Sequence, residues 1–246
     1  MRITVIVPLS RPELWPNVLQ LFRQQTYFDK RLWVVFNGRA LGATALAQGV
    51  ADRVLTSRAN CAIARNTALS ELRAEGGGYF ALWDDDDYYG PGYLSDVASD
   101  AGRAEVTGKQ THFVSYAARF LFFYYPERAS QPTRVAQGGT LAGRAEDALD
   151  FPAMRRGEDL AWCEQMRDKG ARIYNRGLYH YRYCLGGDAA HAHATGVQSV
   201  TSVIYRLGRG RYIGPVDDRI VDGLTPPPNG RPVLPHHPFE PESSEI

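Results

Sequence analysis

Four consecutive aspartates at positions 84–87 are the residues of this sequence best suited to carry chemistry. Adjacent carboxylates repel one another, and the repulsion falls when water or a cation lies between them. Carboxylate oxygens are the ligands that Mg²⁺ and Mn²⁺ prefer, and such ions often take few protein ligands and complete their shell with phosphate oxygens. The alternative is a solvated acidic turn, but the apolar residues 79–83 before the cluster and Tyr88-Tyr89-Gly90-Pro91 after it disfavour a plain exposed charge run. We therefore expect a metal site here.

A second acidic pair, Glu158-Asp159, stands just after Gly157, where a helix is expected to begin. Carboxylates in the first turn of a helix are stabilised by the helix dipole, so helix capping explains the pair as well as a catalytic role does. In the functional interpretation, the pair supplies a general base at a strand–helix junction, pointing into a cleft.

Three weaker candidates lie in the second half of the sequence. His191 and His193 have the spacing that places two side chains on one side of a strand, where they could bind a metal, although a surface loop is the commoner explanation. The glycine-rich stretch 138–144 would let a ligand approach the backbone, and most such stretches are plain loops. The arginines at positions 206, 209 and 211 could close over a diphosphate or remain in solvent.

These candidates need elements that hold them in place, and the first 90 residues predict an α/β fold. Short apolar runs at residues 3–7, 32–36, 53–56 and 79–83 are typical of strands, most of them covered on both faces. Helices are expected from near Pro16 and from an Asn60 cap to about residue 73. This alternation is typical of a doubly wound, mostly parallel sheet flanked by helices, in which ligands lie outside the carboxyl ends of the strands. Asn37 and Asp84 both stand at such ends.

The remainder of the chain is less regular. Residues 113–115 and 119–125 predict the strands of an added hairpin, residues 159–169 a helix, residues 172–174 a short strand, and residues 197–207 a further helix. We expect a single domain over residues 1–222. The prolines that begin at position 226 predict an extended or disordered tail over residues 223–246.

Bulk properties fit a soluble globular protein and exclude few functions. The formal net charge is +1 and 22% of the residues are charged, so no broad basic face demands nucleic acid or an anionic membrane. Three cysteines without a C-x-x-C pair imply neither a disulfide framework nor a zinc site. No secretory signal is found, nor a run of about 20 apolar residues. We expect a cytoplasmic protein that is at most peripheral to a membrane.

The order of the motifs along the chain is more informative than any one of them. Ala64-Arg65-Asn66 in a predicted helix, followed by an apolar strand that runs into Asp84-Asp85-Asp86-Asp87 and then Pro91, is a specific pattern. Looser blocks accompany it in order: Val5-Ile6-Val7-Pro8, Arg11-Pro12-Glu13-Leu14, Gln25-Thr26-Tyr27, Val34-Val35-Phe36-Asn37-Gly38 and Glu158-Asp159. Over about residues 3–170, the sequence resembles the family 2 glycosyltransferases of the GT-A fold.

The resemblance implies a metal-dependent transferase that moves a sugar from a nucleoside-diphosphate sugar to an acceptor hydroxyl, with inversion at the anomeric carbon. A UDP-sugar is the expected donor, and Mn²⁺ or Mg²⁺ the expected cofactor. By the same resemblance, residues 1–100 would bind the nucleotide and residues 101–222 the acceptor, with a small additional β element in the fold. The identity of the acceptor and the formation of a homo-oligomer stay open.

The resemblance also assigns roles to single residues. Asp86 would bind the metal with Asp84 close by, and Asp159 would be the base that deprotonates the acceptor. His191 or His193 would complete the site from its far side. The residues expected around the nucleotide are Pro8, Ser10, Arg11, Phe36, Asn37, Arg65, Asp84 and Asp85. Arg65 would lie near the diphosphate or help to brace the acidic segment.

One departure from the family's pattern concerns the nucleotide base. The family usually has an aspartate at the position of Phe36, and that carboxylate recognises the pyrimidine. Only Asn37 remains polar in this turn, and its amide can pair with a base edge but carries no charge. We therefore expect stacking or apolar contact with the base, and modest selectivity among nucleotides.

Two other classes of protein stay open as alternatives. A nucleotidyltransferase would also use a metal at a doubly wound sheet, but it normally has a glycine- and lysine-rich phosphate loop where this chain has Pro8-Leu9-Ser10-Arg11. The second class is a non-catalytic sugar- or nucleotide-binding protein on the same fold. The presence of both Asp86 and Asp159 argues against it.

Overall fold

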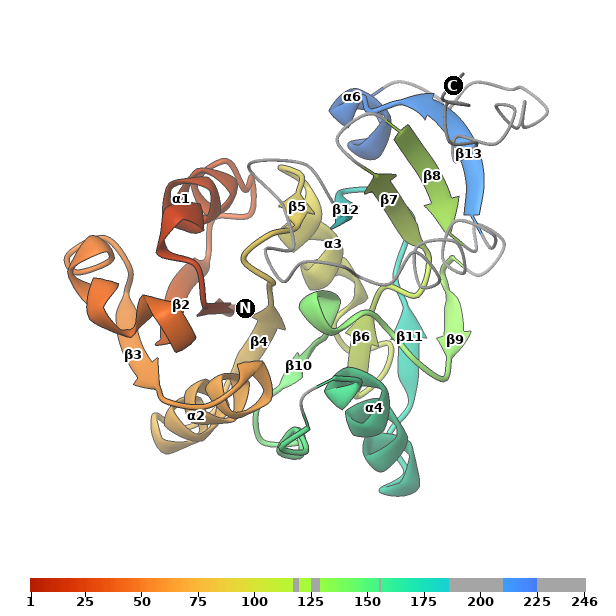
Figure 1. Cartoon of the computed structure of the whole chain (residues 1–246). Helices are drawn as coiled ribbons and strands as arrows, with labels where there is room; N and C mark the ends of the chain where they lie inside the picture. The colour runs from red at the N-terminus through yellow and green to blue at the C-terminus, as the bar shows by residue number, and fades with distance from the viewer. Residues whose placement is uncertain (117–119, 125–128, 155, 186–209, 225–246) are drawn as a thin grey trace, which may run out of the picture.

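The computed structural model describes residues 1–116, 120–124, 129–154, 156–185 and 210–224. Within these residues the chain forms a large sheet of eight strands and a smaller sheet of five, with helices packed on the large one (Figure 1). The predicted helix at residues 197–207 and nearly all of the predicted tail lie outside the described residues.

The first half of the large sheet is the parallel unit that the sequence predicts. The strands β1 (Ile3–Leu9), β2 (Lys30–Asn37), β3 (Arg53–Ser57) and β4 (Tyr79–Leu82) lie in the order β3-β2-β1-β4, all parallel. Every residue of β1 is buried, which explains why its sequence is apolar without alternation. The α/β class and the doubly wound arrangement are confirmed.

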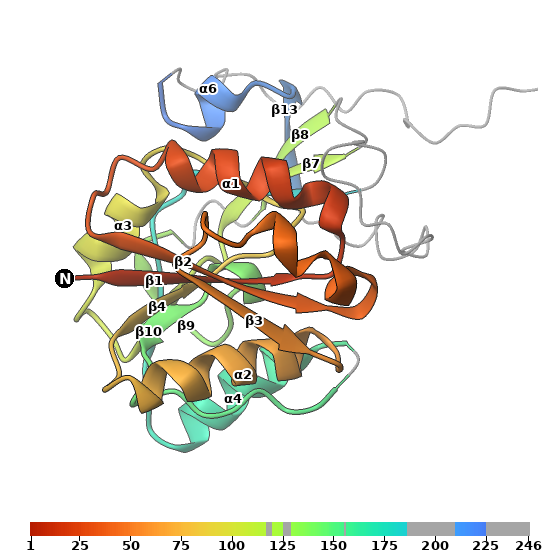
Figure 2. The same ribbon diagram turned by 90° about the vertical axis from the view of Figure 1, so that its left-hand side faces the viewer.

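Helices cover both faces of this sheet. In Figure 2, α1 (Trp15–Arg23) lies on one face, and α2 (Cys61–Ala74) and α4 (Glu158–Asp168) lie on the other. Alternate residues of β1 serve the two cores: Val5 packs in the cluster with α1, whereas Ile6 packs in the cluster with α2. The predicted cap of α2 is confirmed, because the Asn60 side chain accepts a hydrogen bond from the Ile63 N–H at 3.1 Å.

The second half of the large sheet is mixed. It continues from β4 in the order β10 (Ala142–Arg144), β6 (Val106–Gly108), β11 (Ile173–Asn175) and β9 (Gln131–Thr133). Strand β10 is antiparallel to both β4 and β6, and β9 is antiparallel to β11 at the edge. The glycine-rich stretch that the sequence suggests as a loop therefore contains a sheet strand in the middle of the fold.

The smaller sheet lies beside the large one and includes the predicted hairpin. Its order is β13 (Gly210–Pro215), β8 (Phe120–Tyr124), β7 (His112–Tyr116), β12 (Tyr181–Leu185) and β5 (Tyr88–Tyr89). Strands β7 and β8 are antiparallel neighbours, as expected. Because β5 directly follows the four aspartates, the smaller sheet fixes the downstream end of the acidic segment.

Two fully buried cations support the junction between the sheets. Lys109 follows β6 and Arg176 follows β11, its parallel neighbour. The Lys109 ammonium donates to the carbonyls of Gly177 and Tyr179. The Arg176 guanidinium donates to the Thr140 carbonyl and, at 2.7 Å, to the hydroxyl of Tyr93 in α3 (Tyr93–Asp100). Burial, with a smaller contribution from the charge of Arg176, lowers the pKa of Lys109 to about 7.

The lowered pKa predicts a pH-dependent stability. Between pH 7 and 9 the folded protein binds fewer protons at Lys109 than the unfolded chain, whose lysine keeps the ordinary pKa of 10.5. The free energy of unfolding contributed by this group therefore rises with pH across that window. We expect the parent to gain stability relative to Lys109→Met from pH 7 to 9, by about 2 kcal/mol.

Urea unfolding of both proteins at several pH values measures this gain. Lys169→Met, at an exposed lysine, is the matched control and should show no such trend relative to the parent. A constant difference between the parent and Lys109→Met over the whole window would contradict the assigned titration.

Candidate active site

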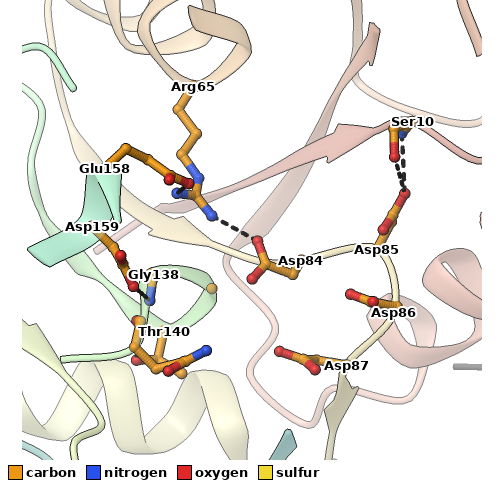
Figure 3. A network of polar contacts seen from close by, with 12 residues as sticks. Ser10, Arg65, Asp84, Asp85, Asp86, Asp87, Gly138, Thr140, Glu158 and Asp159 are labelled. Carbon is orange, nitrogen blue, oxygen red and sulfur yellow. Dashed lines mark hydrogen bonds and ion pairs between the residues drawn. The ribbon is translucent and has the colours of Figure 1, made fainter. Parts of the chain in front are cut away.

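The four aspartates leave the carboxyl end of β4 and run alongside the end of β1. The two strands are parallel, with Ile6 opposite Leu82, so the residues that follow both strands meet at one rim of the sheet (Figure 3). The four carboxylates are held by three different parts of the fold. The negative charge of the segment is therefore distributed over several elements of the fold.

The end of β1 binds Asp85 and Asp86. The Ser10 N–H and hydroxyl donate to Asp85 Oδ2 at 3.0 and 3.4 Å (Figure 3). The Arg11 guanidinium contacts Asp85 and forms an ion pair with Asp86 Oδ2 at 3.0 Å. Burial opposes the charge of Arg11, but the two carboxylates raise its pKa above the ordinary value. Arg11 is therefore a permanent cation at this rim.

Asp84 is held from the opposite side by Arg65 of α2. The Arg65 guanidinium donates to Asp84 Oδ1 at 2.7 Å and to Glu158 Oε1 at 3.3 Å (Figure 3). Its side chain is only 2% exposed and lies over the Phe151 ring, 5.4 Å from the ring centre. One buried arginine thus joins the two acidic groups that the sequence singles out, although they are more than 70 residues apart.

Asp87 faces the smaller sheet. Its carboxylate accepts from the Tyr181 hydroxyl at 2.6 Å and from the Cys184 N–H at 3.1 Å. Complete burial, followed by the negative charges of Asp86 and Asp84, raises its pKa well above the usual range. The role of Asp87 is to anchor the acidic segment to β12.

A tight turn, η4 (Gly138–Thr140), packs against Asp84. The Tyr89 hydroxyl accepts from the Asp84 N–H at 2.7 Å and donates to the Gly139 carbonyl at 2.8 Å. A Cβ atom on Gly139 would lie 2.7 Å from Asp84 Oδ2, so a larger residue does not fit. Gly139 of this stretch, which suggested an approaching ligand from the sequence, allows the close approach of the Asp84 carboxylate.

The pair Glu158-Asp159 forms the first turn of α4 beside the same turn. Asp159 Oδ2 accepts from the Gly138 N–H at 3.2 Å, and Asp159 Oδ1 accepts from the Leu160 N–H at 2.9 Å (Figure 3). Burial raises the pKa of Glu158, although Arg65 acts in the opposite direction. The structure thus brings Asp84, Glu158 and Asp159 around η4 and Arg65.

The residues expected near the nucleotide base lie partly in the hydrophobic core and partly at the rim of the large sheet. Phe36 is completely buried in the core with α1, so a direct contact between its ring and a base is not supported. The pleat of β2 turns the next residue the other way. Asn37 is 4% exposed, and among the described residues its Oδ1 has no hydrogen-bond donor. Pro8 is buried within β1, and Ser10 and Arg11 are engaged by the acidic segment.

The donor set fits a hard divalent cation at the edge of the acidic segment. Asp84 presents a carboxylate that is 25% exposed, and Asp86 follows two residues later on the same loop. The described residues contain no group of three or more His, Cys, Asp or Glu side chains placed to hold a metal. Mg²⁺ and similar ions are commonly held by one or two carboxylates plus phosphates and water, which suits this pair. His191 and His193 lie outside the described residues.

The geometry is that of a nucleotide-binding α/β enzyme fold with its acidic loop at the carboxyl end of a central strand. The sequence matches the model of glycosyl transferase family 2 over residues 4–160, which is more than half of the chain. The chain therefore belongs to glycosyl transferase family 2. No curated protein sequence matches it. In the part of the chain that the structure describes, none of the helices is both long and apolar enough to cross a membrane.

Solved structures of low sequence identity share the GT-A fold of this chain. TarS from S. aureus, residues 1–349 in complex with UDP-GlcNAc, has 17% identity and a TM-score of 0.55, covering 78% of this chain and 60% of TarS. The mannosyltransferase PcManGT from Pyrobaculum calidifontis, in complex with GDP-Man and Mn²⁺, has 18% identity and a TM-score of 0.56. That match covers 84% of this chain and 60% of PcManGT, so the chain spans about three-fifths of each structure.

The hydroxyl of Tyr89 provides a test of the link between the acidic segment and η4. Tyr89→Phe leaves the buried Asp84 N–H and Gly139 carbonyl without this partner, and we expect it to lower the free energy of unfolding by about 1–3 kcal/mol. Chemical denaturation measures the loss. Tyr27→Phe, which removes a hydroxyl that donates to the Met1 carbonyl at an exposed position, is the control and should cost less. Equal losses for the two variants would refute the link.

Proposed function

We propose that this protein transfers a sugar from a nucleoside-diphosphate sugar to an acceptor hydroxyl by direct displacement, with inversion at the anomeric carbon. The observation that carries the proposal is the Arg65 bridge between Asp84 and Glu158. The bridge supports the proposal because it brings Asp84, a candidate metal ligand, close to the first turn of α4, where Asp159 is the candidate base. Membership of glycosyl transferase family 2 supports the same chemistry.

Asp84 and Asp86 would hold a divalent cation, Mn²⁺ or Mg²⁺. Such an ion, when bound, stabilises the negative charge that develops on the leaving diphosphate. PcManGT, which has a similar fold, is described with GDP-Man and Mn²⁺, and this supports the assignment of the cofactor. Arg65 orients Asp84 and reduces the repulsion between the two acidic groups that it bridges.

Asp159 would take the proton from the acceptor hydroxyl as that oxygen attacks the sugar. The backbone donors of Gly138 and Leu160 hold its carboxylate in a defined orientation. Glu158, which contacts Arg65, would support the arrangement without taking the proton. A displacement of this kind needs acidic groups on both sides of the sugar, and the two clusters would provide them.

Asn37 is the side chain that we assign to the nucleotide base. Its buried Oδ1 can accept a hydrogen bond from a ring N–H, a donor that uracil and guanine both carry. The two similar structures are complexes with different nucleotides, UDP-GlcNAc for TarS and GDP-Man for PcManGT, and both bases carry such a ring N–H. A UDP-sugar remains the donor that the family pattern favours.

The test of the proposed function is a donor panel. The protein is incubated with UDP-, GDP-, CDP- and ADP-sugars, with Mn²⁺ or with a chelator, and the release of nucleoside diphosphate is measured. We expect metal-dependent release from at least one donor and its loss in Asp86→Ala. In that variant, the stabilisation by nucleoside diphosphate with Mn²⁺ should also disappear. Asp52→Ala, at the opposite end of the sheet, is the control. Release that is insensitive to the metal and to Asp86 would count against the proposal.

Selectivity for the base is a separate prediction. No carboxylate occupies the position of Phe36, and an amide carries no charge, so we expect UDP and GDP to bind with affinities that differ by no more than about tenfold, which corresponds to about 1.4 kcal/mol. Calorimetry with Mn²⁺ measures both affinities. A preference of several hundredfold for either nucleotide would overturn this expectation. Asn37→Ala should weaken the binding of both nucleotides.

The assignment of the base is tested by a pair of isosteric variants. Asp159→Asn keeps the shape of the side chain but cannot take a proton, so we expect transfer to slow at least about a hundredfold with donor affinity little changed. Glu158→Gln should have a milder effect on the rate. Both are measured with an acceptor that the parent uses. If Glu158→Gln were inactive while Asp159→Asn kept a near-normal rate, Glu158 would be the base.

A further inference from the structure

The carboxylate that we assign to the metal already has a cation of the protein on it. Arg11 forms an ion pair with Asp86 at 3.0 Å, and both side chains are nearly buried, with 11% and 2% of their surfaces exposed. Asp85 contacts the same guanidinium and is itself held by the Ser10 N–H at 3.0 Å. Arg11 is thus fixed over Asp86 by the end of β1.

Two cations on one carboxylate repel each other strongly at a site that excludes most of the water. Arg11 cannot relieve the repulsion by losing its proton, because an arginine remains charged at all ordinary pH values and its carboxylate partners raise its pKa further. A divalent ion that binds Asp86 must therefore displace the guanidinium or bind against its charge. Asp85 would remain in contact with Arg11 after the divalent ion has bound Asp86.

We propose that Arg11 is an internal counter-ion that competes with the divalent cation for Asp86 and moves to the donor diphosphate when the ion binds. The planar guanidinium is well suited to phosphate oxygens. Contacts with the diphosphate therefore replace the ion pair with Asp86 that Arg11 loses. The inference rests on the proposed function for the identity of the ion and the donor. It adds a regulation of the site: the metal binds weakly alone, and metal and diphosphate strengthen each other's binding.

The experiment measures the affinity of the protein for Mn²⁺ alone, without nucleotide, by electron paramagnetic resonance of the free ion. We expect Arg11→Met to bind Mn²⁺ about tenfold more tightly than the parent, because the competing charge is gone. The Mn²⁺ affinity of Arg11→Lys, which keeps the charge, should increase by less. Arg39→Met removes an exposed arginine that pairs with Glu13 and should leave the affinity unchanged. Thermal unfolding checks that each variant is folded.

The double variant Arg11→Met/Asp86→Asn separates direct competition from a general change of charge. In the Asp86→Asn background, the gain from Arg11→Met should fall below about twofold, because the contested carboxylate is absent. The same gain in both backgrounds would overturn the proposal, as would an unchanged or weaker Mn²⁺ affinity in Arg11→Met. Should Arg11→Met fail to fold, Arg11→Gln, which also removes the charge, supplies the test: it should bind Mn²⁺ more tightly than the parent, and an unchanged or weaker affinity would count against the proposal.

The outcome is independent of the donor panel. If no nucleotide-sugar is turned over, the proposed function fails while the competition for Asp86 can still be measured with Mn²⁺. If turnover is metal-dependent and Arg11→Met does not tighten Mn²⁺ binding, only the proposed role of Arg11 is refuted.

Discussion

Four carboxylates on consecutive residues at the end of a buried strand form a concentration of charge that the fold has to neutralise, and the architecture around them follows from this constraint. The partners come from separate elements. Arg65 of α2 binds Asp84, residues at the end of β1 bind Asp85 and Asp86, and β12 of the smaller sheet binds Asp87. The acidic segment is therefore the place where both sheets and the helix layer are joined.

Aromatic packing behind the segment makes this arrangement rigid. The Trp83 and Tyr89 rings stack with centroids 4.2 Å apart, and Tyr93 meets both at an edge. Tyr89 carries the contact to η4, and Arg176 holds the far side of η4 through the Thr140 carbonyl. A site whose work is to position charges needs such support, since small displacements of a carboxylate cost much of its effect.

Much of the fold could be predicted from the sequence because its strands are apolar and its helix signals are local. The buried run of β1 and the Asn60 cap of α2 were predicted from local pattern, and both are confirmed. Strand β10 was not predicted, because three residues that include a glycine carry no periodic signal and its pairing with β4 is decided by distant contacts. The expected contact between Phe36 and the base was wrong, because the period of two along β2 turns Phe36 into the core and Asn37 to the opposite face of the sheet.

The candidate site shows the same division. Residue types and order indicated Asp84, Asp86, Arg65 and Asp159, because their motifs are contiguous in the sequence. The sequence did not indicate which carboxylate each arginine would hold, since the ion pairs of Arg11 and Arg65 join residues 19 to 93 positions apart. The close contact of Gly139 with Asp84 was missed for the same reason, because a glycine needed for close approach looks like any loop glycine.

The central claim is that the rim between the acidic segment and η4 binds a metal–diphosphate complex. A crystal structure of the protein with Mn²⁺ and UDP, or with GDP if that nucleotide binds more tightly, tests it most directly. We expect the ion on carboxylate oxygens of Asp84 or Asp86, the diphosphate on the ion, and the base beside Asn37. A nucleotide bound elsewhere on the protein, with Arg11 still on Asp86 and no ion at the acidic segment, would contradict it.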